Sequence, residues 1–325
     1  MVHSIFGFDW KKSDPHWLLL TKFLYPLDQN YFSAMQAWES VLGEKPSQSI
    51  QRFVNEGLIG LADLENSLSY KFRLPELKNM SKQHGLPVSG NKKDLIKRLI
   101  AKDPLAMKNA VEGLTILQCL PKGKEMAEEY RRIQDEKRNH VETQMLDCIK
   151  QGLFRKACLL MGAFEAKQVF PRGLGINWIN YDPDDDVEFL NLIFKSRPKI
   201  LSGVTNEDLK ALRVGASMMH LWGVNSAKKW MPSGLSLNLR FDNDTAVRMV
   251  LFHVSCKNNI AQYKKNHDII KLVKIIPCGD SCDECKKFIG KRFPLNNVPE
   301  LPHENCTHKY GCRCVASPVI DSWSD

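Results

Sequence analysis

Apolar residues recur at three- and four-residue steps along most of the chain, which is the period of an amphipathic helix. In the N-terminal segment one such stripe ends at Gly43 and consists of Ala34, Ala37, Trp38, Val41 and Leu42. A glycine after the last periodic residue is typical of a helix end. A second short helix is predicted through Ile50, Phe53, Val54 and Leu58. Aromatic and aliphatic stripes at this period usually form a core, and we interpret these as core.

The same period continues toward the C-terminal end. The segment 122–150 predicts a solvated helix, because Glu128 with Arg132 and Arg132 with Glu136 are opposite charges four residues apart. Another helix is predicted to start at Thr205, which is followed by acidic residues that suit a capping box. Its apolar face comprises Leu209, Leu212, Ala216 and Met219. These patterns predict a mainly α-helical protein.

Four further patterns carry no site assignment. The acidic run 182–186 lacks the spacing and glycine of an EF-hand loop, so a solvated turn is expected. The Gly173–Gly175 segment lacks the third glycine of a dinucleotide fingerprint. The carboxylates in 240–244 fit a helix cap and turn as well as a metal-dependent nuclease centre. His220 is expected to be a packed histidine.

Size and composition place the chain among globular proteins. It has 325 residues, 43% hydrophobic and 26% charged, which suits about two domains. The longest uninterrupted apolar stretch, 157–164, is too short to cross a bilayer, so no membrane partner is expected. The segment 1–10 carries Asp9 and no Lys or Arg, unlike a signal peptide. We expect a cytoplasmic protein, nucleoid-associated in a bacterium or nuclear in a eukaryote.

Positive charge is concentrated in one segment. The formal net charge is +9, which favours an anionic partner without naming its class. Segment 67–103 holds three acidic residues, Glu76, Asp94 and Asp103. The same segment holds nine basic ones: Lys71, Arg73, Lys78, Lys82, Lys92, Lys93, Lys97, Arg98 and Lys102. Most of the net charge therefore lies in about a tenth of the sequence.

Two short helices are predicted within this basic segment. The first begins near Leu74, with Pro75 in its first turn and Gly85 at its exit. The second begins near Asn91 and places Lys92 and Lys93 in its first turn. Cations at the positive end of a helix dipole cost about 0.3–1 kcal/mol each. Backbone N–H groups and two ammonium groups would form a phosphate site there, the alternative being that both lysines point into solvent.

The helix pair resembles the SAP domain, a helix-extended-helix module. The matching positions are Leu77, Lys78, Gly85, Leu86, Gly90, Lys92, Leu95, Ile96, Arg98 and Leu99, with Met80 where leucine is usual. The resemblance covers about 35 residues and implies binding of double-stranded DNA, mainly through its backbone. It implies the following DNA contacts: Gly90, Asn91, Lys92 and Lys93 at the phosphates, with Lys97, Arg98 and Lys78.

Cysteines indicate a metal site near the C-terminal end. Six of the ten cysteines lie between 278 and 314, and without a secretory signal such a cluster favours a metal over disulfides. Structural zinc takes four thiolate or imidazole ligands. We predict a zinc ion bound by Cys282, Cys285, Cys312 and Cys314. Cys306 competes as a ligand, Cys278 is spare, and His303 and His308 are nearby alternatives.

The same tail resembles the C-terminal end of phage head-morphogenesis proteins. The matching features are the Cys282–Cys285 pair, the Gly290–Leu295 stretch and the terminal Cys312–Cys314 pair. This similarity spans about 35 residues, and Cys278 and Cys306 lie outside it. It implies a phage-derived structural protein as one alternative function.

The sequence thus predicts a helical body, an embedded SAP-like helix pair and a small irregular C-terminal zinc knuckle. The predicted parts are 1–66, a helical segment; 67–103, the SAP-like module; 104–276, a helical domain; and 277–325, the zinc-binding tail. The predicted function is binding or tethering of duplex DNA. The alternative from another class is a nuclease-type enzyme with its centre in 105–276.

Overall fold

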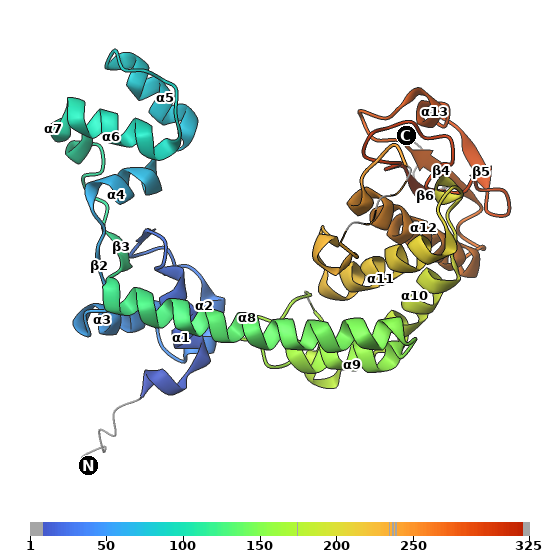
Figure 1. Ribbon diagram of the computed structural model, residues 1–325, viewed down its shortest axis with the longest axis horizontal. Coiled ribbons are helices and arrows are strands. Elements are labelled where there is room, and N and C mark those ends of the chain that lie inside the picture. Colours follow the sequence, from blue (N-terminus) through green and yellow to red (C-terminus); the bar gives the residue numbers. More distant parts are fainter. Residues whose placement is uncertain (1–8, 174, 234, 236, 238, 321–325) are drawn as a thin grey trace. The chain divides into compact units, whose positions relative to one another are not determined.

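The computed structural model describes residues 9–173, 175–233, 235, 237 and 239–320 (Figure 1). In these residues α-helices predominate and two small antiparallel sheets accompany them, which confirms the mainly α prediction. The chain forms two compact units, Met1–Arg138 and Asn139–Asp325. In the described ranges, no helix is both long and apolar enough to span a membrane.

Short helices and a three-stranded sheet build the first core of the N-terminal unit. The elements are η1 (Trp10–Lys12), α1 (Asp14–Lys22), β1 (Leu27–Asp28), α2 (Gln36–Leu42), α3 (Pro46–Asn55), β2 (Ile59–Leu61) and β3 (Ile116–Cys119). Trp38 and Leu42 are buried, and α2 ends at Gly43 with a φ of 70°, as the periodicity predicts. The sheet has the order β1-β3-β2.

The predicted basic helix pair lies between two strands that are hydrogen-bonded to each other. Ile59 pairs with Cys119 and Leu61 with Leu117 in antiparallel register. The intervening chain forms α4 (Leu64–Lys71), α5 (Leu74–Gln83), α6 (Lys92–Lys102) and α7 (Pro104–Asn109). Its buried residues form a separate core of Leu68, Leu77, Leu95, Ile96, Leu99 and Met107. We call these four helices the α4–α7 module.

The long charged helix is α8 (Pro121–Lys150), close to the predicted range. Arg132 pairs with Glu136 as predicted, but its second partner is Glu129, 2.6 Å away and three residues earlier. Glu128 instead lies 3.8 Å from Lys124. The difference arises because Glu129 accepts two hydrogen bonds from the Arg132 guanidinium, a fork geometry that a planar arginine favours.

Packed helices form most of the C-terminal unit. They are α9 (Phe154–Glu165), η2 (Trp178–Asn180), α10 (Asp184–Lys195), η3 (Lys199–Leu201), α11 (Asn206–Trp222), η4 (Lys228–Trp230) and α12 (Asn243–Lys265). The side chain of Thr205 caps α11 by accepting a hydrogen bond from the Asp208 backbone N–H at 3.1 Å. The predicted apolar face of α11 is buried in the core of this unit.

His220 and the acidic run 182–186 meet at one side of this core. His220 Nε2 lies 2.7 Å from Asp186 Oδ1, and the imidazole stacks on Phe189 with ring centroids 4.1 Å apart. Asp184–Asp186 form the first turn of α10, where negative charge stabilises the helix dipole. The acidic run therefore begins a helix, and His220 packs as expected.

A second sheet completes the C-terminal unit. Its elements are β4 (Leu272–Ile276), α13 (Asp283–Lys286), β5 (Arg292–Pro294) and β6 (Val315–Val319), with strand order β5-β4-β6. Val273, Ile275 and Ala316 are buried in the same core as α11 and α12. The cysteine-rich segment therefore shares the core of the helical body.

Close packing at Gly123 yields a test of the first core. A Cβ atom on Gly123 would lie 2.0 Å from the backbone oxygen of Leu58. Alanine is a better helix former than glycine by about 1 kcal/mol, but overpacking its methyl group against the backbone costs about 1–3 kcal/mol of stability. We expect Gly123→Ala to destabilise the N-terminal unit, measured as faster hydrogen exchange in α1 and α3. Gly203→Ala, where the described structure leaves the Cβ position open, should leave that exchange unchanged.

Candidate nucleic-acid interface and candidate metal centre

The α4–α7 module forms the predicted helix pair with the predicted ends. Pro75 lies in the first turn of α5, and Gly85 adopts a φ of 66° after the helix. The Leu86 backbone N–H donates to the Ser81 oxygen at 2.8 Å, and Leu86 packs with Met80 on the module core. The chain thus leaves α5 through a left-handed glycine and folds back on the helix.

The first turn of α6 is closed by a reciprocal cap. Asn91 accepts a hydrogen bond from the Asp94 backbone N–H, and Asp94 accepts one from the Asn91 N–H, both at 3.1 Å. The Asp94 carboxylate therefore faces the positive end of the helix dipole beside Lys92 and Lys93. Sequence reasoning missed this role of Asp94, although Asn followed by an acid three residues later signals it.

Both lysines of this turn reach toward α4. Lys92 Nζ donates to the Ser69 backbone oxygen at 2.5 Å, and Lys92 is half-buried. Lys93 Nζ lies 3.6 Å from Glu65 Oε1, with 68% of the Lys93 side chain exposed. Lys92 thus fastens α6 to α4, whereas Lys93 keeps most of its surface in solvent.

Arg98 holds the extended segment between α5 and α6. Its guanidinium donates to the backbone oxygens of Pro87, at 2.7 Å, and of Ser89. Its Nε donates to the Asp94 oxygen at 3.1 Å. Gly90, the last residue of this extended segment before Asn91, has a φ of 104°. A Cβ atom on Gly90 would lie 3.0 Å from both Arg98 Nη2 and Asp94 Oδ2. Gly90 is therefore required by both its backbone conformation and its close contacts.

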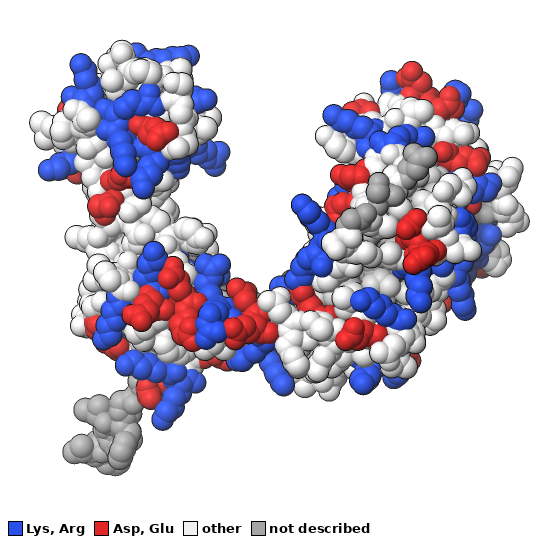
Figure 2. Space-filling view, in the orientation of Figure 1, with Lys and Arg blue, Asp and Glu red and all other residues white. Residues whose placement is uncertain are grey.

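The remaining predicted contacts, Lys78 on α5 and Lys97 on α6, are exposed. Neither forms an ion pair or hydrogen bond with another residue of the described ranges. Figure 2 shows lysine and arginine side chains gathered over the α4–α7 module. The predicted set thus divides into residues that hold the module together and cations available to an anionic partner.

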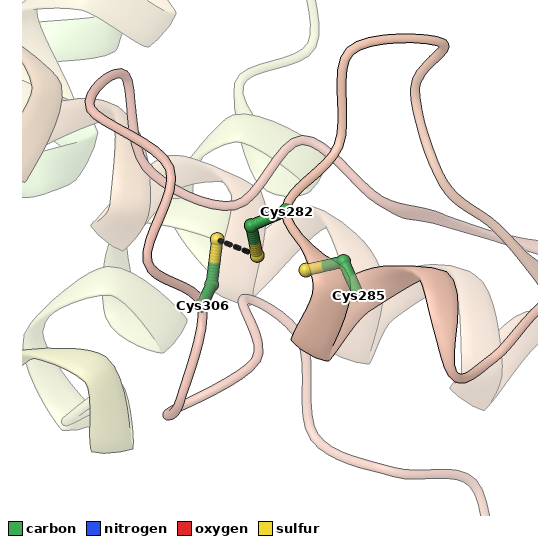
Figure 3. A group of neighbouring side chains, drawn as sticks. All are labelled: Cys282, Cys285 and Cys306. Carbon is green, nitrogen blue, oxygen red and sulfur yellow. Dashed lines mark hydrogen bonds between the residues drawn. The ribbon is translucent and has the colours of Figure 1, made fainter.

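The cysteine cluster brings five thiols together. Cys282, Cys285 and Cys306 form one group whose sulfur atoms all lie within 4.8 Å of one another (Figure 3). Cys285, Cys312 and Cys314 form a second such group. Cys282 precedes α13 and Cys285 lies within it, so one helical turn supplies two thiols. Because Cys285 belongs to both groups, it is the centre of the cluster, which could hold a metal ion.

Two of the sulfur separations match the edge expected of a tetrahedral thiolate site. Cys282 Sγ and Cys306 Sγ are 3.7 Å apart, and Cys285 Sγ and Cys312 Sγ are 3.9 Å apart. A Zn–S bond of about 2.3 Å gives a tetrahedron with edges of about 3.8 Å. A disulfide would require about 2.05 Å, and these cysteines are free thiols.

The surroundings of Cys282 favour the thiolate form that a metal requires. Burial opposes ionisation of its thiol, but backbone N–H groups of Cys285 and Thr307 outweigh this and lower its pKa to about 6. The Thr307 N–H donates to Cys282 Sγ at 3.3 Å. Burial instead raises the pKa of Cys285, so a cation would have to displace that proton.

The other candidate ligands have different partners. Cys278 Sγ donates to the Arg313 backbone oxygen at 3.1 Å. His308 Nε2 lies 3.5 Å from Asp280 Oδ2, and His303 packs edge-on against Phe288 with ring centroids 5.0 Å apart. In the described part of the chain these three residues belong to neither thiol group. The structure thus places all four predicted ligands in the cluster, together with Cys306, the predicted competing ligand.

Comparison with known families identifies the basic helix pair. Residues 71–101 match the family model of the SAP domain. The match covers α5 and α6, which confirms the resemblance seen in the sequence. No curated protein and no solved structure matches the chain. The SAP match indicates DNA binding in general, and we call the α4–α7 module, which contains the match, the SAP module below.

The Arg98 contacts predict a structural role for this residue. Arg98→Ala removes three hydrogen bonds from a charged donor, which we expect to destabilise the SAP module by about 1–3 kcal/mol. The measurement is hydrogen exchange of α5 and α6. Lys97→Ala removes the same charge from the neighbouring exposed position and should leave exchange unchanged. Equal protection of α5 and α6 in both variants would contradict this structural role of Arg98.

Proposed function

We propose that this protein binds double-stranded DNA by its backbone phosphates through the SAP module, and holds a structural zinc ion in its C-terminal unit. The observation that carries the first part is the SAP match over the most basic segment of the chain. DNA presents closely spaced phosphates, so clustered lysines bind it by releasing counterions.

Contacts within the module support two roles for its cations: some hold the module together and others bind phosphates. Arg98 and Lys92 donate to backbone oxygens and hold the shape of the module. Lys78, Lys93 and Lys97 are exposed and remain available to phosphates. Gly90 and Asn91 lie at the turn that precedes α6, and we infer that a phosphate lies over this turn beside the exposed Lys93. Such contacts read the backbone and carry little sequence information.

Salt dependence tests the phosphate contacts. We expect Lys93→Ala/Lys97→Ala to weaken binding to all duplex sequences about equally and to flatten the plot of log affinity against log salt by ~2 units at most, at ~0.9 per lost contact. Fluorescence anisotropy across a salt series measures both. Lys195→Ala/Lys210→Ala removes two exposed lysines outside the module and is the matched control. Unchanged affinity in the first variant would refute this end of α6 as the DNA site.

The thiol cluster supports zinc because of its ligand chemistry. Thiolates are soft ligands, and four of them close a tetrahedral sphere, which is the arrangement of structural zinc. We take Cys282, Cys285, Cys306 and Cys312 as the ligands because the 282–306 and 285–312 separations match the edge of such a tetrahedron, and Cys314 is a fifth thiol beside Cys285 and Cys312. The ion would fasten the irregular segment between β5 and β6 to α13.

Metal content tests this assignment. We expect about one zinc per chain by mass spectrometry after dialysis. Cys285→Ser should lose the metal most readily, because Cys285 belongs to both thiol groups. Cys306→Ser should lower the zinc content and make 278–314 protease-sensitive, whereas Cys278→Ser should not. A metal-free protein with a protease-resistant tail would contradict the site.

A further inference from the structure

The three-stranded sheet of the C-terminal unit exposes one face in an ordered pattern. The other face carries Val273, Ile275 and Ala316, which are buried in the core. Residues directly opposite in antiparallel strands point to the same side of a sheet. Lys274 lies opposite Arg292 on one side and Ser317 on the other. These three residues form a polar row across the exposed face.

The polar row joins two positive charges. Like charges directly opposite each other on neighbouring strands destabilise a sheet. Lys274 and Arg292 are both exposed, and neither forms an ion pair with another residue in the described ranges. The Ser317 hydroxyl adds a neutral donor at the same level. An anionic group placed over this row would relieve the repulsion.

Apolar residues lie on both sides of the polar row. Leu272 faces Pro294 and Val319 in one row. Ile276 faces Val315 in the other, with 43% and 56% of their surfaces exposed. Exposed apolar residues arranged in rows mark an interaction surface more often than scattered ones do. We call these three rows the cationic sheet face.

We propose that the cationic sheet face binds a segment of a partner protein that carries an acidic side chain between two apolar ones. Adjacent rows are two residues apart, or about 6.8 Å along a strand. Alternate side chains of an extended segment repeat at the same distance. An apolar, acidic, apolar series at alternate positions therefore meets the apolar, cationic and apolar rows in order.

The chemistry of the face favours a protein segment over DNA. DNA phosphates would engage Lys274 and Arg292 but would leave the two apolar rows in water. The rows contain no aromatic side chain on which a base could stack. A partner with apolar side chains buries both rows while its carboxylate is bound by the two cations.

Reversing the charge of the central peptide residue and of the two cations on the sheet tests this proposal. The probe is a labelled peptide in which Leu, Glu and Leu occupy alternate positions and Thr occupies the positions between them. A control peptide has the same sequence with Lys in place of Glu. We expect the full-length protein to prefer the Glu peptide by about tenfold in anisotropy titrations up to about 1 mM. The variant Lys274→Glu/Arg292→Glu should prefer the Lys peptide instead, which also shows that the face remains folded.

Two results would overturn the proposal. One is binding of both peptides with equal affinity, or of neither, by the full-length protein. The other is a loss of duplex DNA affinity in Lys274→Glu/Arg292→Glu without peptide binding, which would make the face a DNA contact. The control Lys195→Glu/Lys210→Glu carries the same charge change on α10 and α11 and should keep the original preference. The result is independent of DNA binding by the SAP module.

Discussion

The antiparallel pairing of β2 with β3 sets the organisation of the N-terminal unit. Ile59 and Cys119 are far apart in the sequence, yet they lie opposite each other in the sheet. The Leu120 backbone N–H also donates to the Leu58 oxygen at 2.8 Å, and Gly123 allows α8 to pass close to that oxygen. The chain therefore enters and leaves the SAP module at neighbouring strands. A module inserted in this way, with its own core, can bind a partner without disturbing the first core.

Electrostatics within the module separates structural cations from available ones. The macrodipole of α6 would disfavour Lys92 and Lys93, but Asp94 supplies a compensating carboxylate in the same turn. Arg98 donates from its planar guanidinium to two loop oxygens and to the Asp94 oxygen, a fixed and widely spaced set of donors that a lysine lacks. Positive charge alone therefore does not identify a phosphate contact; the backbone partners of each cation decide which ones are free.

The sequence predicts features with local causes and misses those with distant ones. The ends of α2, α5 and α11 follow from Gly43, Pro75 and Thr205, because caps and breakers act within one turn. The β2–β3 pairing was not predicted, since strands this short carry no periodic signal. The sequence predicts Cys306 only as a competing ligand. Its spacing to Cys312 resembles no tight turn, and only the folded chain brings its sulfur to Cys282.

The thiol cluster and the cationic sheet face depend on the same segment of chain. Cys312 lies three residues before Val315, the first residue of β6, and Cys285 lies in the helix that precedes β5. Short edge strands are held by few hydrogen bonds, so their register needs support from elsewhere. A metal ion bound to these thiols would restrain the chain at the start of β6 and before β5. Such an ion would thereby help the strands to hold Lys274 opposite both Arg292 and Ser317.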